Sequence, residues 1–279
     1  MCTFDTTLAA NQRRFILSTG RRGRKSYLNQ FRSIKNKGVI SAHSVCRKAS
    51  ASDRKASGRK AGVDERRRSW EGWGVHTISI DTYTGGLFET NAYYLAEARI
   101  LVDAPEGAAA WLEEKGHAVD ILLLTHGHVD HVWAAAQIQR EHKAALYYHP
   151  DTAPMILDPK FYERHGFPWS VAPVVPGHFL EACEGRIFGG LEFQVLEVPG
   201  HCPGSLCFYH APSGIVFGGD VLFAGGVGRW DLPGGDRDLL LTGIREKLFP
   251  LGDTVKVLSG HGPVTTIGRE RVANPYLVP

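Results

Sequence analysis

The sequence lacks any hydrophobic run long enough to cross a membrane. Its strong apolar runs are short, such as Ile121–Leu124, whereas a membrane-spanning helix needs about 20 apolar residues. The first 72 residues also lack the apolar core that a secretory signal has. Both absences argue against a membrane protein, while a hydrophobic content of 43% in 279 residues is sufficient for a folded core.

Cysteine is sparse and irregularly placed. The five cysteines form no Cys-x-x-Cys pair, and their number is odd. This usage argues against a disulfide framework and against a zinc site made of thiolates. It predicts a reducing compartment, and we expect the cytoplasm.

Acidic residues are scarce in the first part of the chain. Residues 1–72 carry 18 lysines and arginines against 5 acids, so their net charge is +13, whereas residues 73–279 carry 14 against 24, a net charge of −10. We predict a basic, disordered extension over 1–72 and a folded domain over 73–279. The extension is open to three interpretations: an organellar transit peptide, a basic arm for nucleic acid or anionic surfaces, or a segment without a folded role.

The folded domain shows strand patterns at both ends and helical patterns between and after them. We expect strands at 75–80, 91–96, 99–102, 121–124, 145–148, 186–188, 191–198, 206–209, 215–217 and 254–258. We expect helices at 105–115, with Gly116 as its C-cap, from the end of the 125–131 loop to about 142, from 150, and at 236–248. This order predicts an α/β (α+β) domain of two packed sheets with helices outside. The irregular stretch 158–178 is long enough to be a flap over a site, with a packed surface excursion as the alternative.

One loop concentrates chemistry that packing does not need. Residues Thr125–His131 read Thr-His-Gly-His-Val-Asp-His and join an apolar strand to a helix start. Imidazole and carboxylate without matching thiolate are typical ligands of zinc, iron or manganese. Because a single structural zinc takes fewer ligands from one loop, the pattern predicts half of a site for two metal ions.

Three more residues of the same kind follow apolar strands at glycine-rich turns. His201 lies in Pro199–Ser205, Asp220 follows Gly218-Gly219, and His261 lies between Gly260 and Gly262. Glycine lets the backbone turn sharply and approach an ion closely. Seven candidate ligands with a bridging carboxylate suit two divalent ions, for which we predict zinc first and iron or manganese as alternatives. The candidates are His126, His128, Asp130, His131, His201, Asp220 and His261.

This ordered set resembles the metallo-β-lactamase superfamily. Five further stretches narrow the resemblance to the glyoxalase II-like (hydroxyacylglutathione hydrolase-like) branch. These stretches are Pro199–Ser205, Gly219–Phe223, Gly228-Arg229-Trp230-Asp231, Gly260–Pro263 and the C-terminal Thr266–Arg271 with Asn274-Pro275-Tyr276. The third and the last of them argue against a β-lactamase proper. The resemblance covers residues 75–279.

The resemblance implies a four-layer αββα sandwich with the site at one edge. By matching position, one ion is held by His126, His128 and His201, and the other by Asp130, His131 and His261. Asp220 bridges the two. A hydroxide formed on the ions would attack a thioester carbonyl, with Asp130 and Asp220 as catalytic groups that orient ligands and accept the proton.

Substrate residues are less clearly marked. Arg229 is a candidate for holding a substrate carboxylate, although a fork onto Asp231 explains it as well. Tyr147 and Tyr148 are candidates for the pocket wall, with simple packing as the alternative. The expected partner is a small-molecule thioester, with a glutathione conjugate as one option. Only 18 residues follow His261, so we do not expect the helical domain that grips glutathione in the long enzymes.

Two other activities remain open. Persulfide dioxygenases of the same superfamily use one iron, held at the positions of His126, His201 and Asp220. A metal-dependent nuclease is disfavoured, because a domain with a net charge of −10 repels phosphate backbones. The sequence does not indicate an oligomeric state.

Overall fold

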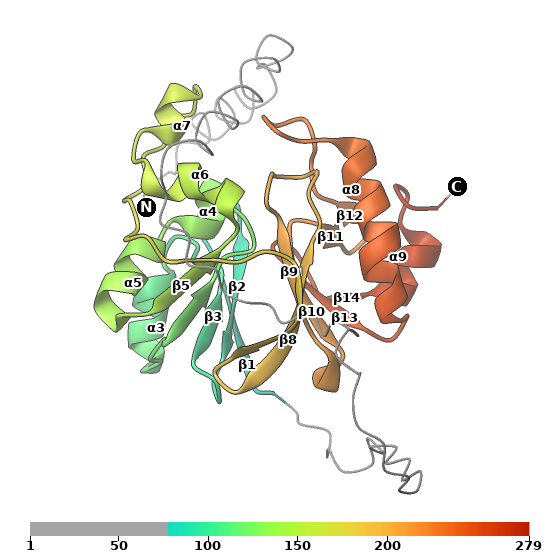
Figure 1. The fold of residues 1–279 in the computed structure, drawn as a ribbon, viewed down its shortest axis with the longest axis horizontal. Coiled ribbons are helices and arrows are strands. Elements are labelled where there is room, and N and C mark those ends of the chain that lie inside the picture. Colours follow the sequence, from blue (N-terminus) through green and yellow to red (C-terminus); the bar gives the residue numbers. More distant parts are fainter. Residues whose placement is uncertain (1–77, 279) are drawn as a thin grey trace, which may run out of the picture.

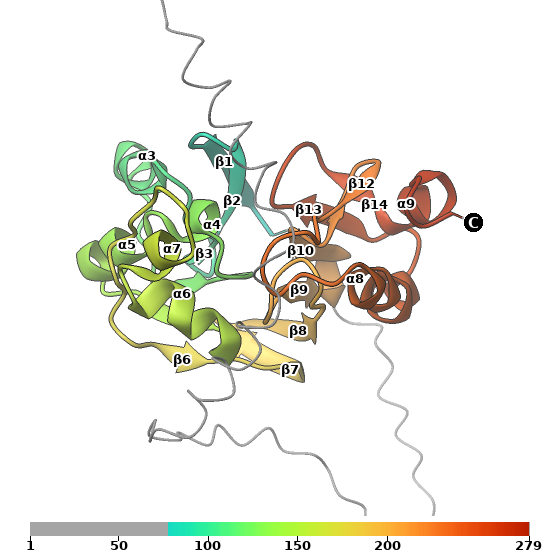
Figure 2. The ribbon, with the colours of Figure 1, turned by 90° about the horizontal axis from the view of Figure 1, so that it is seen from above.

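Two six-stranded β-sheets lie face to face, and helices cover the outer face of each (Figure 1; Figure 2). The computed structural model describes residues 78–278. The four layers confirm the predicted αββα sandwich. The predicted disordered extension over 1–72 and the start of the folded domain at 73 lie outside the described residues.

The first sheet is antiparallel at one edge and parallel for the rest. In spatial order its strands are β1 (Ile80–Gly85), β2 (Thr90–Leu95), β3 (Ile100–Val102), β4 (Ile121–Leu123), β5 (Ala145–Tyr148) and β6 (His178–Phe179). Its helices are α3 (Ala108–Lys115), α4 (Val129–Val132), α5 (Ala135–His142), η1 (Pro150–Thr152), α6 (Ala153–Leu157) and α7 (Phe161–Arg164). Gly116 caps α3 in the left-handed conformation, as predicted.

The second sheet is mostly antiparallel, with β10 and β13 parallel. Its strands in spatial order are β14 (Thr265–Thr266), β13 (Lys256–Ser259), β10 (Ile215–Gly219), β9 (Leu206–His210), β8 (Leu191–Glu197) and β7 (Cys183–Phe188). A small hairpin, β11 (Leu222–Phe223) with β12 (Gly226–Val227), follows β10. The remaining helical segments are η2 (Ala211–Ser213), α8 (Arg237–Gly243), the π-helical η3 (Ile244–Leu248), η4 (Phe249–Leu251) and α9 (Ile267–Ala273).

Alternating side chains of the strands divide the core into three layers. In β3, Ile100 and Val102 point between the sheets, whereas Leu101 packs under the helices. In the second sheet, Phe217 points between the sheets and Val216 packs against α8. Because successive strand residues face opposite sides, strands buried on both faces read as continuous apolar runs.

The structure corrects several predicted bounds. Of the strand expected at 75–80, residues 75–77 lie outside the described part of the chain, and in the described part the strand is Ile80–Gly85, which pairs with β2 from Ile80 opposite Leu95 to Gly85 opposite Thr90. The stretch 158–178 is not wholly irregular, since it contains α7 and the first residue of β6. The helix expected over 236–248 is α8, capped by the Asp236 side chain, followed by a π-helical turn. Helix α9 and the β11–β12 hairpin were not predicted.

The parallel strands bring their carboxyl ends to one edge of the sandwich. The turn after β3, the loop after β4, the turn after β10 and the turn after β13 all lie there, between α7 on one side and β11 on the other (Figure 1). Open sheets with parallel strands bind ligands at such carboxyl ends. The candidate site therefore forms where the predicted loops converge.

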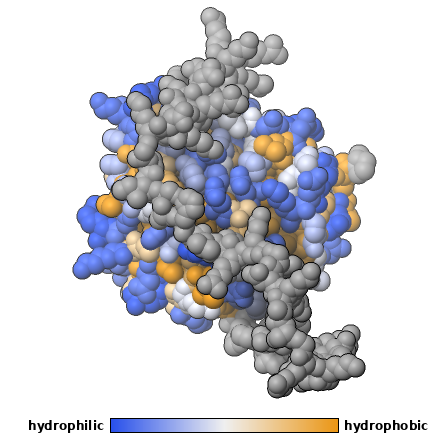
Figure 3. Space-filling model, viewed as in Figure 1, coloured by the Kyte–Doolittle hydropathy of each residue, from blue (hydrophilic) through white to orange (hydrophobic). Residues whose placement is uncertain are grey.

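The outer surface is mixed in polarity. On the face seen in Figure 3, hydrophilic residues separate small groups of hydrophobic ones wherever described atoms are visible. Within residues 78–278, no helix combines the length and the apolar composition that crossing a membrane requires.

Candidate metal centre

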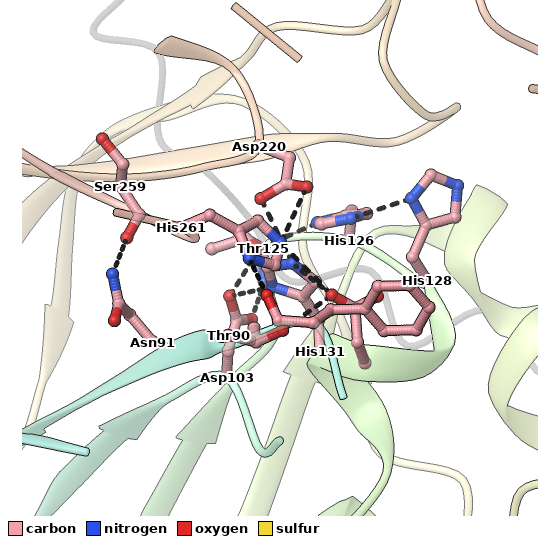
Figure 4. A network of polar contacts seen from close by, with 12 residues as sticks. Thr90, Asn91, Asp103, Thr125, His126, His128, His131, Asp220, Ser259 and His261 are labelled. Carbon is pink, nitrogen blue, oxygen red and sulfur yellow. Dashed lines mark hydrogen bonds and ion pairs between the residues drawn. The ribbon is translucent and has the colours of Figure 1, made fainter. Parts of the chain in front are cut away.

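The loop after β4 brings four of the predicted ligands into one place. His128 is the N-cap of α4, and the single turn of that helix carries Asp130 and His131. His126 precedes them on the buried part of the loop. The loop and the short helix turn His126, His128 and His131 toward the edge between the sheets, where His261 and Asp220 approach from the second sheet (Figure 4).

All seven predicted ligands converge. Their ligand atoms form three groups in which the atoms lie within 4.8 Å of one another. The groups are His126, His128 and His201; Asp130, His131 and His261; and His126, His131 and Asp220. The first two groups are the two sets of three that the family resemblance implied.

Asp220 lies between the two sets. Its Oδ1 is 3.2 Å from His131 Nε2, and its Oδ2 is 3.5 Å from His201 Nε2 and 3.3 Å from His261 Nε2. One carboxylate therefore contacts ligands of both sets, as a bridging ligand must.

Two buried atoms lack the partner that an ion would provide. His131 Nε2 and Asp220 Oδ1 are both buried and lie 3.2 Å apart, but neither makes a hydrogen bond among the described residues. Buried polar atoms are normally satisfied. The donor set of imidazole nitrogens and carboxylate oxygens matches zinc, iron or manganese, so the residues fit two divalent ions.

Gly260 permits this close approach. A Cβ atom added there would lie 2.2 Å from Asp220 Oδ1 and 2.6 Å from the His131 ring. Any larger residue would displace two of the candidate ligands, so the glycine before His261 has a steric cause.

The histidine rings are oriented by hydrogen bonds from their second nitrogen. His201 Nδ1 donates to the carbonyl of Arg229 at 2.7 Å, and His261 Nδ1 donates to the carbonyl of Phe88 at 2.9 Å. A carbonyl only accepts, so in both rings the proton is on Nδ1 and Nε2 is left to bind an ion.

Asp103 plays the same part for His131, and the sequence analysis missed it. Its carboxylate is buried and lies 2.7 Å from His131 Nδ1, while it accepts hydrogen bonds from the backbone and hydroxyl of Thr125, both at 2.8 Å (Figure 4). Its available signal was an acid directly after a buried strand beside the ligand-bearing strand. Asp130 is held similarly, by the hydroxyl of Thr90 at 2.7 Å.

We expect Asp103→Asn to weaken one ion site selectively. The φ angle of Asp103 is 60°, a region that Asn tolerates, so the backbone should be retained. The Thr125 backbone N–H needs the amide oxygen, so the NH₂ group faces His131 Nδ1, removes the acceptor and favours the tautomer with its proton on Nε2. The affinity for the ion at Asp130, His131 and His261 should fall about 10- to 100-fold, as measured by competition with a metal chelator.

The matched control is Asp81→Asn. The Asp81 carboxylate also pairs with a histidine, His117, at 2.8 Å, but on the exposed surface. The metal affinity of the Asp81→Asn variant should equal that of the unchanged protein. Equal affinities in both variants would show that Asp103 does not position His131.

Burial and neighbouring charge divide the histidines into two kinds. Burial is the main cause that lowers the pKa of His126, His128 and His201. The pKa of His128 falls to about 3. Burial alone would also lower the pKa of His261, but the hydrogen bonds to Asp130 and Asp220 raise it to about 10. The first set is therefore neutral and ready to bind an ion at neutral pH, whereas His261 must give up a proton.

A cavity of about 440 Å³ opens beside the ligands. Its walls include His128, Asp130, His201, Asp220 and His261, together with aromatic residues of the predicted flap. The flap prediction is thus supported by Phe161, Tyr162, Phe167 and Trp169, all of which line the cavity.

Of the three predicted substrate residues, one lines the cavity and two do not. Arg229 lines the cavity, and its guanidinium makes the alternative fork onto Asp231, with two bonds of 2.8 Å. Tyr147 and Tyr148 do not line the cavity, which corrects the prediction made for them. They belong to β5. Tyr148 is buried under the helices, whereas Tyr147 packs against the core between the two sheets and stacks on His178.

Cys202 is a packed residue rather than a reactive thiol. It is fully buried beside Met155, and burial raises its pKa to about 12. His149 is buried near Glu197 and holds the backbone of Asp151, so it too is structural.

The C-terminal signature braces the cavity wall, which the sequence did not indicate. Glu270 in α9 is buried and accepts hydrogen bonds from Thr265, Gly225 and Asn274. Asn274 also donates to the carbonyl of Gly226. These bonds tie the β11–β12 turn, next to the cavity, to the last helix.

A sandwich of this kind with a His and Asp cluster at its edge defines a metallo-hydrolase fold. The chain belongs to the metallo-beta-lactamase superfamily, whose profile matches residues 85–261. It is 38% identical over 170 residues to the hydroxyacylglutathione hydrolase GloC of Haemophilus influenzae, covering 60% of this chain and 79% of that protein.

Solved structures share the fold. BLEG-1, described as a B3 metallo-beta-lactamase, is 34% identical with a TM-score of 0.66, covering 72% of this chain and 100% of its own. TTHA1623, in a di-iron-bound form, is 37% identical with a TM-score of 0.62, and the match covers 71% of this chain and 100% of TTHA1623. ETHE1 from Myxococcus xanthus is 24% identical with a TM-score of 0.57, and the match covers 71% of this chain and 84% of ETHE1. At that identity it shows the fold alone.

Proposed function

We propose that this protein is a glyoxalase II-like thioesterase that uses two divalent metal ions. The observation that carries the proposal is the pair of three-residue ligand groups, with Asp220 in contact with both, on the wall of a cavity. The similarity to GloC favours thioesters over other substrates of the fold.

The residues fit two ions, with His126, His128 and His201 holding one and Asp130, His131 and His261 the other. Two ions bound there supply hydroxide near neutral pH and a Lewis acid for a carbonyl oxygen. We propose zinc as the metal. Iron is the main competitor, because TTHA1623 is described in a di-iron-bound form, and manganese suits the same ligands.

Asp130 and Asp220 are the proposed catalytic carboxylates. Burial would raise the pKa of Asp130, but the charge of His131 and the hydrogen bond from His261 lower it instead. The pKa of Asp220 is likewise held well below its usual value, mainly by His131. Both groups therefore stay ionised, so they accept hydrogen bonds from a water molecule and orient it.

The reaction is hydrolysis of R–CO–S–R′ by water. The C–S bond breaks, and the products are a carboxylate, a thiol and a proton. A thiolate leaves without prior protonation, because thiols are acidic compared with alcohols or amines. The chain thus needs no separate acid near the leaving group, and among the residues lining the cavity we assign none.

The test is elemental analysis of the full chain purified without added metal, followed by a substrate screen. We expect about two metal equivalents per chain and hydrolysis of glutathione or coenzyme A thioesters. One equivalent of iron, with oxygen uptake on a persulfide, would instead establish the dioxygenase. A β-lactam belongs in the screen because BLEG-1 is described as a β-lactamase, and cleavage of that compound alone would overturn the proposal.

Two further points are part of the proposal. We propose a cytoplasmic location from the cysteine usage, with an organellar one as the alternative if residues 1–72 act as a transit peptide. We propose a small-molecule partner rather than nucleic acid, since the −10 charge of residues 73–279 opposes binding to phosphate backbones.

A further inference from the structure

The cavity beside the metal ligands has walls that suit an apolar group. Its volume of about 440 Å³ lies in the range of about 300–1,000 Å³ found for small-molecule sites. The flap contributes Phe161, Phe167 and Trp169 to one wall, and Phe223 and Leu232 stand on the other. Rings and aliphatic side chains of this kind bind substrates by excluding water rather than by hydrogen bonding.

The aromatic wall is held in place by its own contacts. Phe167 stacks on Trp169 with ring centres 5.5 Å apart, and Trp169 meets Phe88 of the β1–β2 turn edge-on at 5.7 Å. The buried hydroxyl of Tyr162 donates to the carbonyl of Gly127 in the ligand loop. The flap is thereby attached both to the turn between β1 and β2 and to the ligand loop after β4, so the cavity is preformed.

The cavity offers little to bind the charges of glutathione. Among its lining residues the permanent cation is Arg229, and Asp231 already accepts both bonds of its fork. Glutathione carries two carboxylates and an ammonium group. Placing these against aromatic walls without partners costs free energy, so the peptide belongs outside, in solvent.

We propose that the cavity selects thioesters by a large apolar or aromatic acyl group, while the thiol carrier stays at the mouth and is weakly recognised. This inference rests on the proposed thioesterase function. It assigns specificity to the flap, with Trp169 as a binding residue for the acyl group.

Four thioesters test the selection: phenylacetyl and acetyl N-acetylcysteamine, phenylacetylglutathione and lactoylglutathione. We expect kcat/KM for phenylacetyl N-acetylcysteamine to exceed that for the acetyl compound about 10- to 100-fold, since burying a ring has an effect of that order. The two phenylacetyl compounds should differ little despite their different carriers. A preference for lactoylglutathione over phenylacetylglutathione would overturn the inference.

Trp169→Ala tests the residue, with Trp111→Ala as the matched control. Trp111 is half-buried in α3 and packs on Tyr83, away from the cavity. The ratio of kcat/KM for the phenylacetyl and acetyl compounds should fall about tenfold in Trp169→Ala and stay unchanged in Trp111→Ala. This ratio does not depend on the fraction of folded protein, so partial misfolding cannot imitate the result. An unchanged ratio in Trp169→Ala would contradict the inference.

Binding of a compound that cannot be hydrolysed separates the inference from the proposed function. The probe is the ketone in which a methylene group replaces the sulfur of phenylacetyl N-acetylcysteamine, measured by calorimetry. Tight binding that Trp169→Ala weakens, without hydrolysis of any thioester, would support the cavity's specificity and reject the thioesterase. Thioester hydrolysis with no difference in affinity between this ketone and its acetyl counterpart would reject the inference and retain the thioesterase.

Discussion

The His128→Ala variant is expected to lose one metal equivalent and most of its hydrolytic activity. His128 belongs to the ligand group with His126 and His201, and its Nδ1 lies 3.1 Å from His126 Nε2. The low pKa of this half-buried ring, about 3, leaves it neutral and able to bind an ion. Losing the ion should reduce kcat/KM by roughly 1,000-fold or more, because a bound ion contributes several kcal/mol to transition-state stabilisation.

Elemental analysis and thioester hydrolysis are measured on the same preparation, with His142→Ala as the control. His142 is partly buried, and its ring makes a long contact of 3.4 Å with the Val119 amide, far from the ligand groups. The control should retain both ions. Retention of full metal and activity in His128→Ala would contradict the two-ion site. Retention of a single iron in both the variant and the unchanged protein would favour a mononuclear enzyme.

Asp220→Asn is expected to affect both ions at once. The carboxylate contacts His131, His201 and His261, which belong to different ligand groups. An amide keeps the shape but loses the negative charge, and its NH₂ group would face a ring nitrogen or an ion in either orientation. We expect loss of both ions and a fall in kcat/KM of about 1,000-fold or more.

Bound metal also stabilises the folded chain, so the melting temperature provides a readout besides activity. In excess zinc, the unchanged protein should melt at a higher temperature than in chelator, whereas Asp220→Asn should show little difference. Asp120→Asn, an exposed carboxylate paired with Arg99, serves as the control. A zinc-dependent rise in Asp220→Asn as large as in the control would show that the ions do not need this carboxylate.

The sequence predicted that the candidate ligands meet at one edge, because each of them follows a strand that is buried and therefore apolar. The runs before Thr125, Asp220 and His261 gave both the strand and the position of the ligand after it. The role of Asp103 was not predicted, because its sequence signal is one acid among many. That role depends on β3 lying parallel to β4. Glu270 escaped because hydrogen bonds to distant turns do not leave a local pattern.

Tyr147 and Tyr148 show the limit of the argument from sequence. They were candidates for the pocket wall, but β5 points Tyr147 and Tyr148 into two different core layers, and neither ring lines the cavity. The same limit applies to 158–178. Its aromatic composition suggested a flap, but only the contacts of Trp169 with Phe167 and Phe88 show which rings form the wall.

The sequence alone determined the layered fold and the set of candidate ligands, which the family resemblance divided in two, because apolar periodicity and metal-ligand chemistry are local properties of the chain. Tertiary structure decided which ligands meet, how their rings are oriented and what the cavity excludes. These properties depend on contacts between residues far apart in sequence, such as Asp220 with His131 and Trp169 with Phe88. Parallel strand pairing brings such residues to one edge, and no short stretch of sequence contains that information.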